Sequence, residues 1–568
     1  MTELEIREKR ADLGDSFRSG VLILTLSAVI VKIIGLIYKI PMLTLLGSEG
    51  MGYFNSAYEI YTLFGVVSTA GLPVAMSVLI SRARCGREMT AAKTKRGGAS
   101  AAMTEERIFS ASRSLFLAVG AVGSLLMLSL SPLFSLLLGS RKVIYCIAVI
   151  SPTVLFICIV GVYRGFFQGL GRMRETAISQ VIEAVFKLAF GLILAYVALR
   201  RGYSAPVVAA FGVMGLVLGI AMSALYLALS KRAHGRAGGL GQAVGHAAAR
   251  TDGKMQACGE ACDEAVARVE GALHRQICRE LLAIAVPIAL SSAVISVTKI
   301  IDMTVILRRM QDIGHTAAEA FSAYGGYTTL ALPLFSLAPA LTGSVALPLV
   351  PSLSSCVASG DREGQVAVVS DALRLTSVLA MPISLGLSLF SREILTLIFV
   401  GQEGAVALCA PLLSILALSV PLACFITVEN AVLQAYSSAT LPIISMLAGS
   451  AVKIILAYFL IGNSDVGIAG APISTFFCDL VINAINLGFI ARKMPRAVGF
   501  SVIAKPFLAA FIAVGGARLA LSALAASLGE SNLITIASIA LCALIYLPIS
   551  LAIGATSKDD LLSLKRKC

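Results

Sequence analysis

The amino-acid sequence predicts an all-α polytopic membrane protein with about 14 transmembrane helices. Of its 568 residues, 57% are hydrophobic, and the mean hydropathy is +0.88. Only 14% are charged, whereas a soluble domain carries roughly 25% charged residues. The apolar residues gather in fourteen runs, each near or above the ~20 residues that a bilayer core requires.

The predicted spans cover 20–40, 53–81, 108–138, 143–168, 177–199, 205–230, 281–307, 322–355, 366–390, 404–435, 439–461, 466–490, 501–528 and 532–554. Several are longer than a perpendicular crossing needs, so we expect tilted or broken helices. Gly71-Leu72-Pro73 interrupts the second span, and Pro333, Pro339 and Pro348 interrupt the eighth. Because proline removes a helix hydrogen bond, these positions predict kinks, which either serve conformational change or are static.

The distribution of basic residues predicts the topology. The net charge is +14. With the N-terminus inside, the expected cytoplasmic segments hold 29 Lys and Arg residues, and the opposite loops hold 7. This asymmetry follows the positive-inside rule and predicts two cytoplasmic termini in the cell membrane. The excess charge therefore indicates membrane orientation and attraction to anionic lipids, and no nucleic-acid partner is expected.

An internal repeat predicts two lobes. Ala57-Tyr58-x-x-Tyr61-Thr62 matches Ala323-Tyr324-x-x-Tyr327-Thr328 at an offset of 266, and Gln168 and Lys187 match Gln434 and Lys453 at the same offset. Because the repeat unit spans six helices, an even number, the two copies have parallel topology. The predicted organisation is a cytoplasmic segment 1–19, a first lobe 20–230 (spans 1–6), a cytoplasmic linker 231–279, a second lobe 280–495 (spans 7–12), and 496–568 with two further spans and a basic cytoplasmic tail.

The linker contains His246, Cys258, Cys262, His274 and Cys278. Their spacing does not match a standard zinc pattern, so no metal site is expected and a zinc site remains the alternative.

The first span carries two lysines on one face. Thr25, Lys32 and Lys39 recur every seven residues, which places them on the same side of a helix. A lysine at mid-span costs roughly 2.5–3.5 kcal/mol on insertion scales, so Lys32 is a candidate substrate-binding residue. Lys39 is a second candidate, and snorkelling to the interface is its alternative reading.

The seventh span pairs opposite charges. Lys299 and Asp302 are three residues apart, so they either form a structural ion pair or Asp302 holds Lys299 until an anionic ligand competes for it. Glu59 in the second span is the corresponding candidate for balancing Lys32.

Arg164 and Gln168 lie one turn apart at the cytoplasmic end of the fourth span. Arginine suits bidentate binding of phosphate, and snorkelling to headgroups is the alternative. Glu183, Lys187 and the repeat-equivalent Lys453 are expected to balance charge or to line the site.

Lys32, Lys39, Arg164 and Lys299 would create a positive field in a low dielectric if they converged on one cavity. A pyrophosphate headgroup, with dense negative charge and many acceptor oxygens, fits such a field. Nothing in this site implies covalent chemistry or a cofactor, so a transporter is predicted rather than an enzyme, with coupling to an ion or to the membrane potential.

Several motifs carry a resemblance to a known family. They are Leu22-Ile23-Leu24-Thr25, Lys32-Ile33-Ile34-Gly35, Ile40-Pro41, Gly71-Leu72-Pro73-Val74-Ala75, Arg164-Gly165-x-x-Gln168-Gly169 and Ala177-Ile178-Ser179-Gln180-Val181-Ile182-Glu183. Over most of its length the chain resembles the stage V sporulation protein B and polysaccharide biosynthesis branch of the multidrug/oligosaccharidyl-lipid/polysaccharide (MOP) exporter superfamily. The resemblance implies a V-shaped bundle like that of MATE and MurJ proteins, and a cationic central cavity. It also implies two C-terminal helices beyond the repeats and the flipping of undecaprenyl-pyrophosphate-linked sugars. Such flippases usually carry arginines in the cavity, whereas the first span here carries lysines.

The predicted function is therefore a lipid-linked oligosaccharide flippase for a cell-wall or polysaccharide precursor such as lipid II. Its partners would be that polyprenyl-pyrophosphate-linked glycan, membrane lipids and the cell-wall or polysaccharide synthesis machinery. A cation-coupled multidrug exporter of the MATE type is the first alternative, but cationic drugs favour an acidic cavity. A membrane glycosyltransferase would need a larger external loop with acidic residues, and a scaffold for sporulation or wall synthesis would not need the lysines.

Overall fold

The computed structural model describes residues 3–93, 104–247, 259–436, 440–494, 499–528 and 532–555. Within these ranges the chain forms helices joined by short turns, and no strand occurs in them. The predicted all-α class is confirmed. The chain divides into two compact units, Met1–Ile300 and Ile301–Cys568, with the boundary inside the long helix α9. The predicted lobe limits at 20–230 and 280–495 stay a prediction.

The first unit contains α1 (Glu3–Thr69), α2 (Leu72–Lys93), α3 (Glu105–Ser129), α4 (Ser131–Leu138), α5 (Val143–Ile150), α6 (Thr153–Gly169), α7 (Met173–Arg200), α8 (Ala205–Ala247) and most of α9 (Gly259–Asp312). Helix α1 is interrupted at Gly47, whose φ of 65° and ψ of 174° are not helical and suit glycine. The expected interruption at Gly71-Leu72-Pro73 is confirmed, because α1 ends at Thr69 and α2 begins at Leu72.

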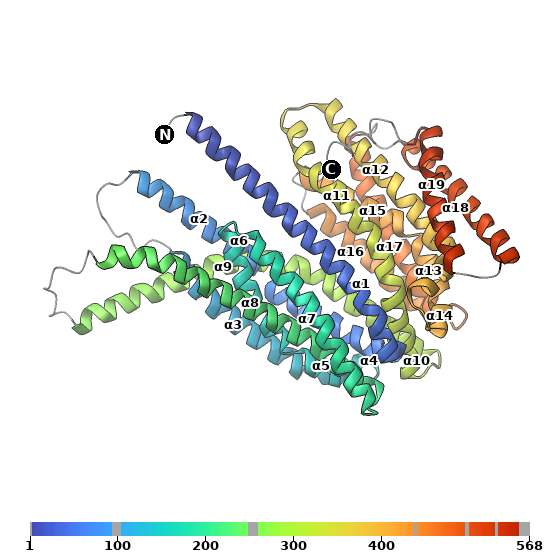
Figure 1. Ribbon diagram of the computed structural model, residues 1–568, viewed down its shortest axis with the longest axis horizontal. Coiled ribbons are helices and arrows are strands. Elements are labelled where there is room, and N and C mark those ends of the chain that lie inside the picture. Colours follow the sequence, from blue (N-terminus) through green and yellow to red (C-terminus); the bar gives the residue numbers. More distant parts are fainter. Residues whose placement is uncertain are drawn as a thin grey trace. The chain divides into compact units, whose positions relative to one another are not determined.

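Small residues hold α7 and α8 together in the first unit. The two helices lie side by side, and both pack on α1 (Figure 1). A Cβ added at Gly215 of α8 would lie 2.3 Å from the Cα of Gly191 on α7. A Cβ added at Gly219 would lie 2.8 Å from the carbonyl oxygen of Glu183. These glycines let the two backbones touch, as is common between membrane helices.

The second unit contains the end of α9, α10 (Ala317–Gly326), the π-helix η1 (Tyr327–Ala331), α11 (Leu332–Ala358), α12 (Arg362–Leu389), α13 (Ser391–Ile398), α14 (Glu403–Ala417), α15 (Val420–Ala435), α16 (Thr440–Ile461), the 3₁₀ turn η2 (Gly467–Ala469), α17 (Gly470–Lys493), α18 (Phe500–Leu528) and α19 (Asn532–Ala552). The predicted break in the eighth span is confirmed. The segments Ala317–Gly343 and Pro348–Ala358 are bent by 41°.

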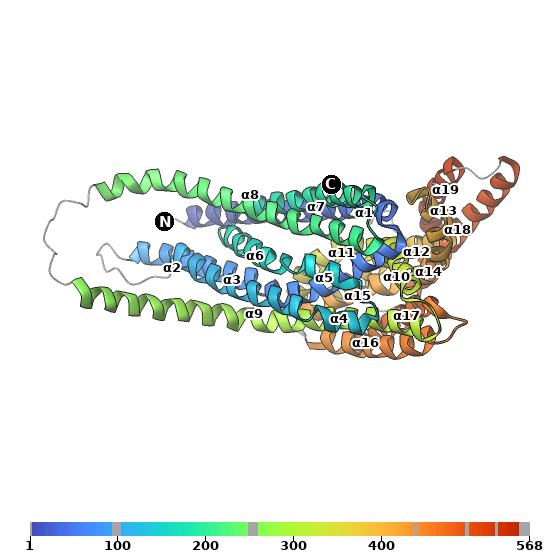
Figure 2. The same ribbon diagram turned by 90° about the horizontal axis from the view of Figure 1, so that it is seen from below.

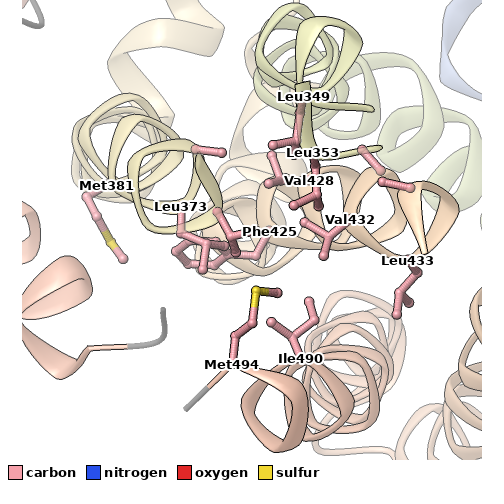
Figure 3. Close-up of a cluster of buried hydrophobic side chains, with 14 of the residues drawn as sticks. Leu349, Leu353, Leu373, Met381, Phe425, Val428, Val432, Leu433, Ile490 and Met494 are labelled. Carbon is pink, nitrogen blue, oxygen red and sulfur yellow. The ribbon is translucent and has the colours of Figure 1, made fainter. Parts of the chain in front are cut away.

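Helix α15 lies at the centre of the second unit. Its side chains Phe425, Val428 and Val432 contribute to a buried apolar cluster (Figure 3). Leu349 and Leu353 of α11, Leu373 and Met381 of α12, and Ile490 of α17 also belong to this cluster. The last two helices, α18 and α19, run beside each other as a hairpin (Figure 2), and α18 also packs on α12.

The described helices fit a membrane. Eleven of them are long and apolar enough to cross a bilayer, and the number rises to 13 if each of two bent pairs is one span. One candidate, Ile30–Ser81, has 52 residues, more than twice the ~20 residues of one crossing. It contains the Gly47 break, so it has room for two crossings. The multi-pass membrane architecture is confirmed, and the count of 14 stays a prediction.

Candidate functional site

Arg164 is the best-defined cation of the first unit. Its Nη2 donates to Glu183 Oε2 at 2.8 Å and to Ser223 Oγ at 3.4 Å, and its Nε donates to Ser179 Oγ at 3.0 Å. The Arg164 side chain is only 17% exposed. The guanidinium at the end of α6 therefore points toward α7 and α8, which contradicts the snorkelling alternative. An anion that bound Arg164 would compete with Glu183.

The glycines of the Arg-Gly-x-x-Gln-Gly motif explain this placement. A Cβ at Gly165 would lie 2.9 Å from the carbonyl oxygen of Pro73, and one at Gly169 would lie 2.7 Å from Cβ of Ile80. Both glycines therefore press α6 against α2. Gln168 follows Arg164 by one turn on a neighbouring face and is half-buried.

A second group of charges lies where α1 meets α7. The Nζ of Lys187 lies 5.7 Å from the centre of the Tyr38 ring, in cation–π range. Lys39 lies within electrostatic range of both Lys187 and Glu59. Glu183 in turn lies within electrostatic range of Lys187, so two ammonium groups and two carboxylates gather here. The structure places Glu59 beside Lys39. In the described part of the chain Glu59 makes no ion pair with Lys32, the partner expected from the sequence. The Lys32 side chain is exposed.

Asp302 has a different partner from the one predicted. Its Oδ2 accepts a hydrogen bond of 2.8 Å from Nζ of Lys453, and the two side chains are 17% and 20% exposed. The expected Lys299–Asp302 pair is therefore wrong for this structure, because Asp302 pairs with α16 rather than along α9. Lys299 is exposed and makes no ion pair among the described residues.

The Lys453 ammonium is also within electrostatic range of Tyr327 and Asp479. Oδ1 of Asp302 and Oδ2 of Asp479 are buried without a hydrogen-bond partner in the described structure. Tyr327 starts the π-helix η1, and π-helical turns are frequent at functional sites. In the sequence, Tyr327 stood out only as part of the repeat match and not as a candidate site residue. The local sign of irregular backbone was Pro333, which lacks an N–H and follows the π-helix by two residues.

The predicted convergence of Lys32, Lys39, Arg164 and Lys299 on one cavity stays a prediction, as do their binding roles. For the linker, the side chains of His246, Cys258 and Cys262 lie outside the described residues. His274 Nε2 is 3.2 Å from Ser114 Oγ on α3. Within the part of the chain that the structure describes, no three His, Cys, Asp or Glu side chains gather as a metal site would require.

Comparisons with known proteins identify the family. A family model described as "Polysaccharide biosynthesis protein" matches residues 17–356. The chain is 23% identical over 506 residues to the lipid II flippase MurJ of Bacillus subtilis (strain 168), covering 86% of this chain and 84% of that protein. It is 23% identical over 556 residues to stage V sporulation protein B of the same organism, covering 96% and 97%.

Solved structures confirm the fold. A lipid II flippase MurJ in an inward closed conformation superposes with a TM-score of 0.67 at 15% identity, covering 93% of this chain and 98% of that one. An inward-facing multidrug resistance MATE family transporter of the MOP superfamily gives 0.56 at 14% identity, covering 82% and 98%. The predicted resemblance is thus confirmed. With more than half of its length matched by the family model, the chain belongs to the polysaccharide biosynthesis protein family.

Proposed function

We propose that this protein is a flippase that moves an undecaprenyl-pyrophosphate-linked oligosaccharide, such as a cell-wall or polysaccharide precursor, from the inner to the outer leaflet of the cytoplasmic membrane. Both termini would lie in the cytoplasm, and the cycle would be alternating access without covalent chemistry. The curated relatives, one a lipid II flippase, support this substrate class.

The observation that carries the proposal is the excess of positive charge in the spans of the first unit. Among the candidate site residues there, five cations outnumber two carboxylates: Lys32, Lys39, Arg164, Lys187 and Lys299 against Glu59 and Glu183. Ionisable groups in membrane spans are costly, so they usually mark a substrate path. A surplus of cations favours an anionic ligand. It disfavours the MATE-type alternative, since a cationic drug would be repelled.

The contacts suggest how a pyrophosphate would be held. Arg164 donates one hydrogen bond to Glu183, through Nη2, whereas a phosphate can accept two parallel bonds from a guanidinium and carries more charge. Substrate would therefore displace Glu183 from the guanidinium. Lys39, which lies near Glu59, and Lys187, which lies near Glu183, would add point charges. The pyrophosphate would be released when Glu183 pairs again with Arg164 and Glu59 again neutralises Lys39.

The test is outer-leaflet lipid II in cells depleted of their own flippase, with each variant at matched membrane expression. We expect the wild type to restore lipid II externalisation and Arg164→Gln to reduce it at least tenfold, since a charge-assisted bidentate contact contributes roughly 1.5–3 kcal/mol. The matched control is Arg141→Gln, an exposed arginine in the turn between α4 and α5.

Lys39→Gln and its exposed control Lys142→Gln extend the test to the lysines. Equal externalisation by Lys39→Gln, Arg164→Gln and wild type would refute the cationic site. If the folded wild-type protein does not restore lipid II externalisation, the substrate is another lipid-linked glycan.

A further inference from the structure

Glu429 lies in the apolar core of the second unit without a counter-charge. It is 0% exposed, in the middle of α15. Phe425 and Val432, one turn before and after it, belong to the apolar cluster of Figure 3. Neither carboxyl oxygen of Glu429 has a hydrogen-bond partner in the described structure. An unpaired carboxylate in such a place is so costly that a proton or another cation must accompany it.

Asn486 of α17 is the polar neighbour of Glu429. Its amide lies beside the carboxyl group, it is also 0% exposed, and both its Nδ2 and its Oδ1 lack a partner among the described residues. Four orphaned polar atoms therefore meet between α15 and α17, two from each side chain. The nearby Asn483 is already engaged, since its Nδ2 donates to the carbonyl oxygens of Asp479 and Leu422.

No charged group compensates Glu429 from the helices packed around it. Helix α11 carries no Asp, Glu, Lys, Arg or His. The charged residues on the other neighbouring helices are Arg362, Glu363, Asp371 and Arg374 on α12, Lys453 on α16, Asp479, Arg492 and Lys493 on α17, and Lys505 and Arg518 on α18. Over the described residues none of these makes an ion pair with Glu429. Arg374 is paired with Asp371 and Lys453 with Asp302.

One proton satisfies all four orphaned atoms. A neutral carboxyl group can donate its O–H to the amide oxygen of Asn486 and accept the amide N–H on its carbonyl oxygen. An ionised carboxylate only accepts, so it would leave Asn486 Oδ1 unsatisfied. A metal cation fits less well, because oxygen-ligated Ca²⁺ and Mg²⁺ take about six to eight ligands and this pair offers three side-chain oxygens.

The site has a route for exchange. A cavity of about 530 Å³ lies against it, walled by α12, α15, α17 and α18, with Ser384, Glu429 and Asn483 as the polar side chains of a mostly apolar lining. A cavity needs only about 10–15 Å³ to admit a water molecule, although an apolar wall holds water weakly. Water that enters transiently can carry a proton to or from the carboxyl group.

We propose that Glu429 and Asn486 form a proton-binding site of the second unit, which loads and unloads one proton through the adjoining cavity during the transport cycle. Proton binding stands on the structure of this unit alone, and only its coupling to transport rests on the proposed flippase function. The two parts are therefore tested separately.

The first experiment is infrared spectroscopy of the purified protein, in the carbonyl-stretch region of protonated carboxyl groups. At pH 7 we expect a band that Glu429→Gln removes and that Asn486→Leu shifts, since the leucine removes the hydrogen-bonding amide. Glu403→Gln, at an exposed glutamate on α14, leaves the band unchanged. Replacing sodium by choline also leaves it unchanged. Identical spectra for wild type and a folded Glu429→Gln protein would overturn the proposal, and so would a band that appears only without sodium.

The second experiment measures flipping in proteoliposomes with and without an imposed pH gradient. A gradient of one unit can shift the distribution of lipid coupled to one proton by up to about tenfold. We expect wild type and Glu403→Gln to respond and Glu429→Gln to flip without responding. An unaltered response in Glu429→Gln refutes the coupling. If wild type does not flip lipid at all, the flippase proposal fails, while the infrared result still decides proton binding.

Discussion

Removing Lys453 should destabilise the second unit by an amount that its geometry allows us to estimate. At 2.8 Å from Asp302, and with an effective dielectric constant of about 20, the Coulomb attraction is about 6 kcal/mol. Desolvation of both groups offsets part of it. Removing one partner of a buried pair typically costs about 3–5 kcal/mol, because the other charge is left uncompensated. With both side chains about one-fifth exposed, we expect Lys453→Met to cost about 3 kcal/mol.

The assay is the free energy of unfolding in mixed detergent micelles. The double variant Asp302→Asn/Lys453→Met should recover most of the loss, since replacing both members of such a pair is often nearly neutral. The matched control is Arg374→Met, which removes the cation paired with Asp371; because the Asp371 carboxylate is 62% exposed and screened by solvent, the loss of this ion pair should cost at most about 1 kcal/mol. Equal losses for Lys453→Met and Arg374→Met, or no recovery in the double variant, would refute the interpretation of Asp302–Lys453 as a stabilising buried pair.

Two further predictions concern packing and energy coupling. Gly215→Val should destabilise the first unit by at least about 1–3 kcal/mol, because the Cβ of the new valine would meet the backbone of Gly191. The control Gly515→Ala, in open space on α18, should be neutral or slightly stabilising. Thermal unfolding of both variants in detergent measures the difference. Flipping should also slow when the membrane potential is collapsed, because moving one charge through 100 mV is worth about 2.3 kcal/mol. An unchanged rate of lipid externalisation after adding an ionophore would contradict the idea that the potential returns the cationic site to its inward-facing state.

The sequence predicted those features of the fold that local chemistry encodes. Apolar run length predicted the spans, and glycine and proline predicted the breaks before Leu72 and near Pro348. The Gly47 interruption was not predicted, because a glycine inside an apolar run is compatible with a helix as well as with a turn. The π-helix at Tyr327 depends on a one-residue register shift in the helix, which composition does not reveal.

The charged pairs show where sequence reasoning stops. Lys299 was the predicted partner of Asp302 because helix periodicity relates neighbours three residues apart. The observed partner is 151 residues away, on α16, and only the packing of helices brings it close. Arg164 and Glu183 were both predicted site residues, but their direct contact across the α6–α7 turn was not. In each case a local rule identified the right residue types, and tertiary packing decided which pairs formed.

The two lysines at equivalent positions of the sequence repeat illustrate how alike sequences can acquire different electrostatics. Lys187 has a tyrosine ring and a second lysine as neighbours; Glu183 lies within electrostatic range, but no carboxylate is within ion-pair distance of Lys187 in the described structure. Lys453 is bound to Asp302 and lies near Asp479. The first unit therefore keeps an excess of positive charge, which suits an anionic headgroup. The second neutralises its lysine and adds buried acids, Asp479 and Glu429, which suit protons. A transporter that used both would bind its substrate with one set of charges and draw energy through the other.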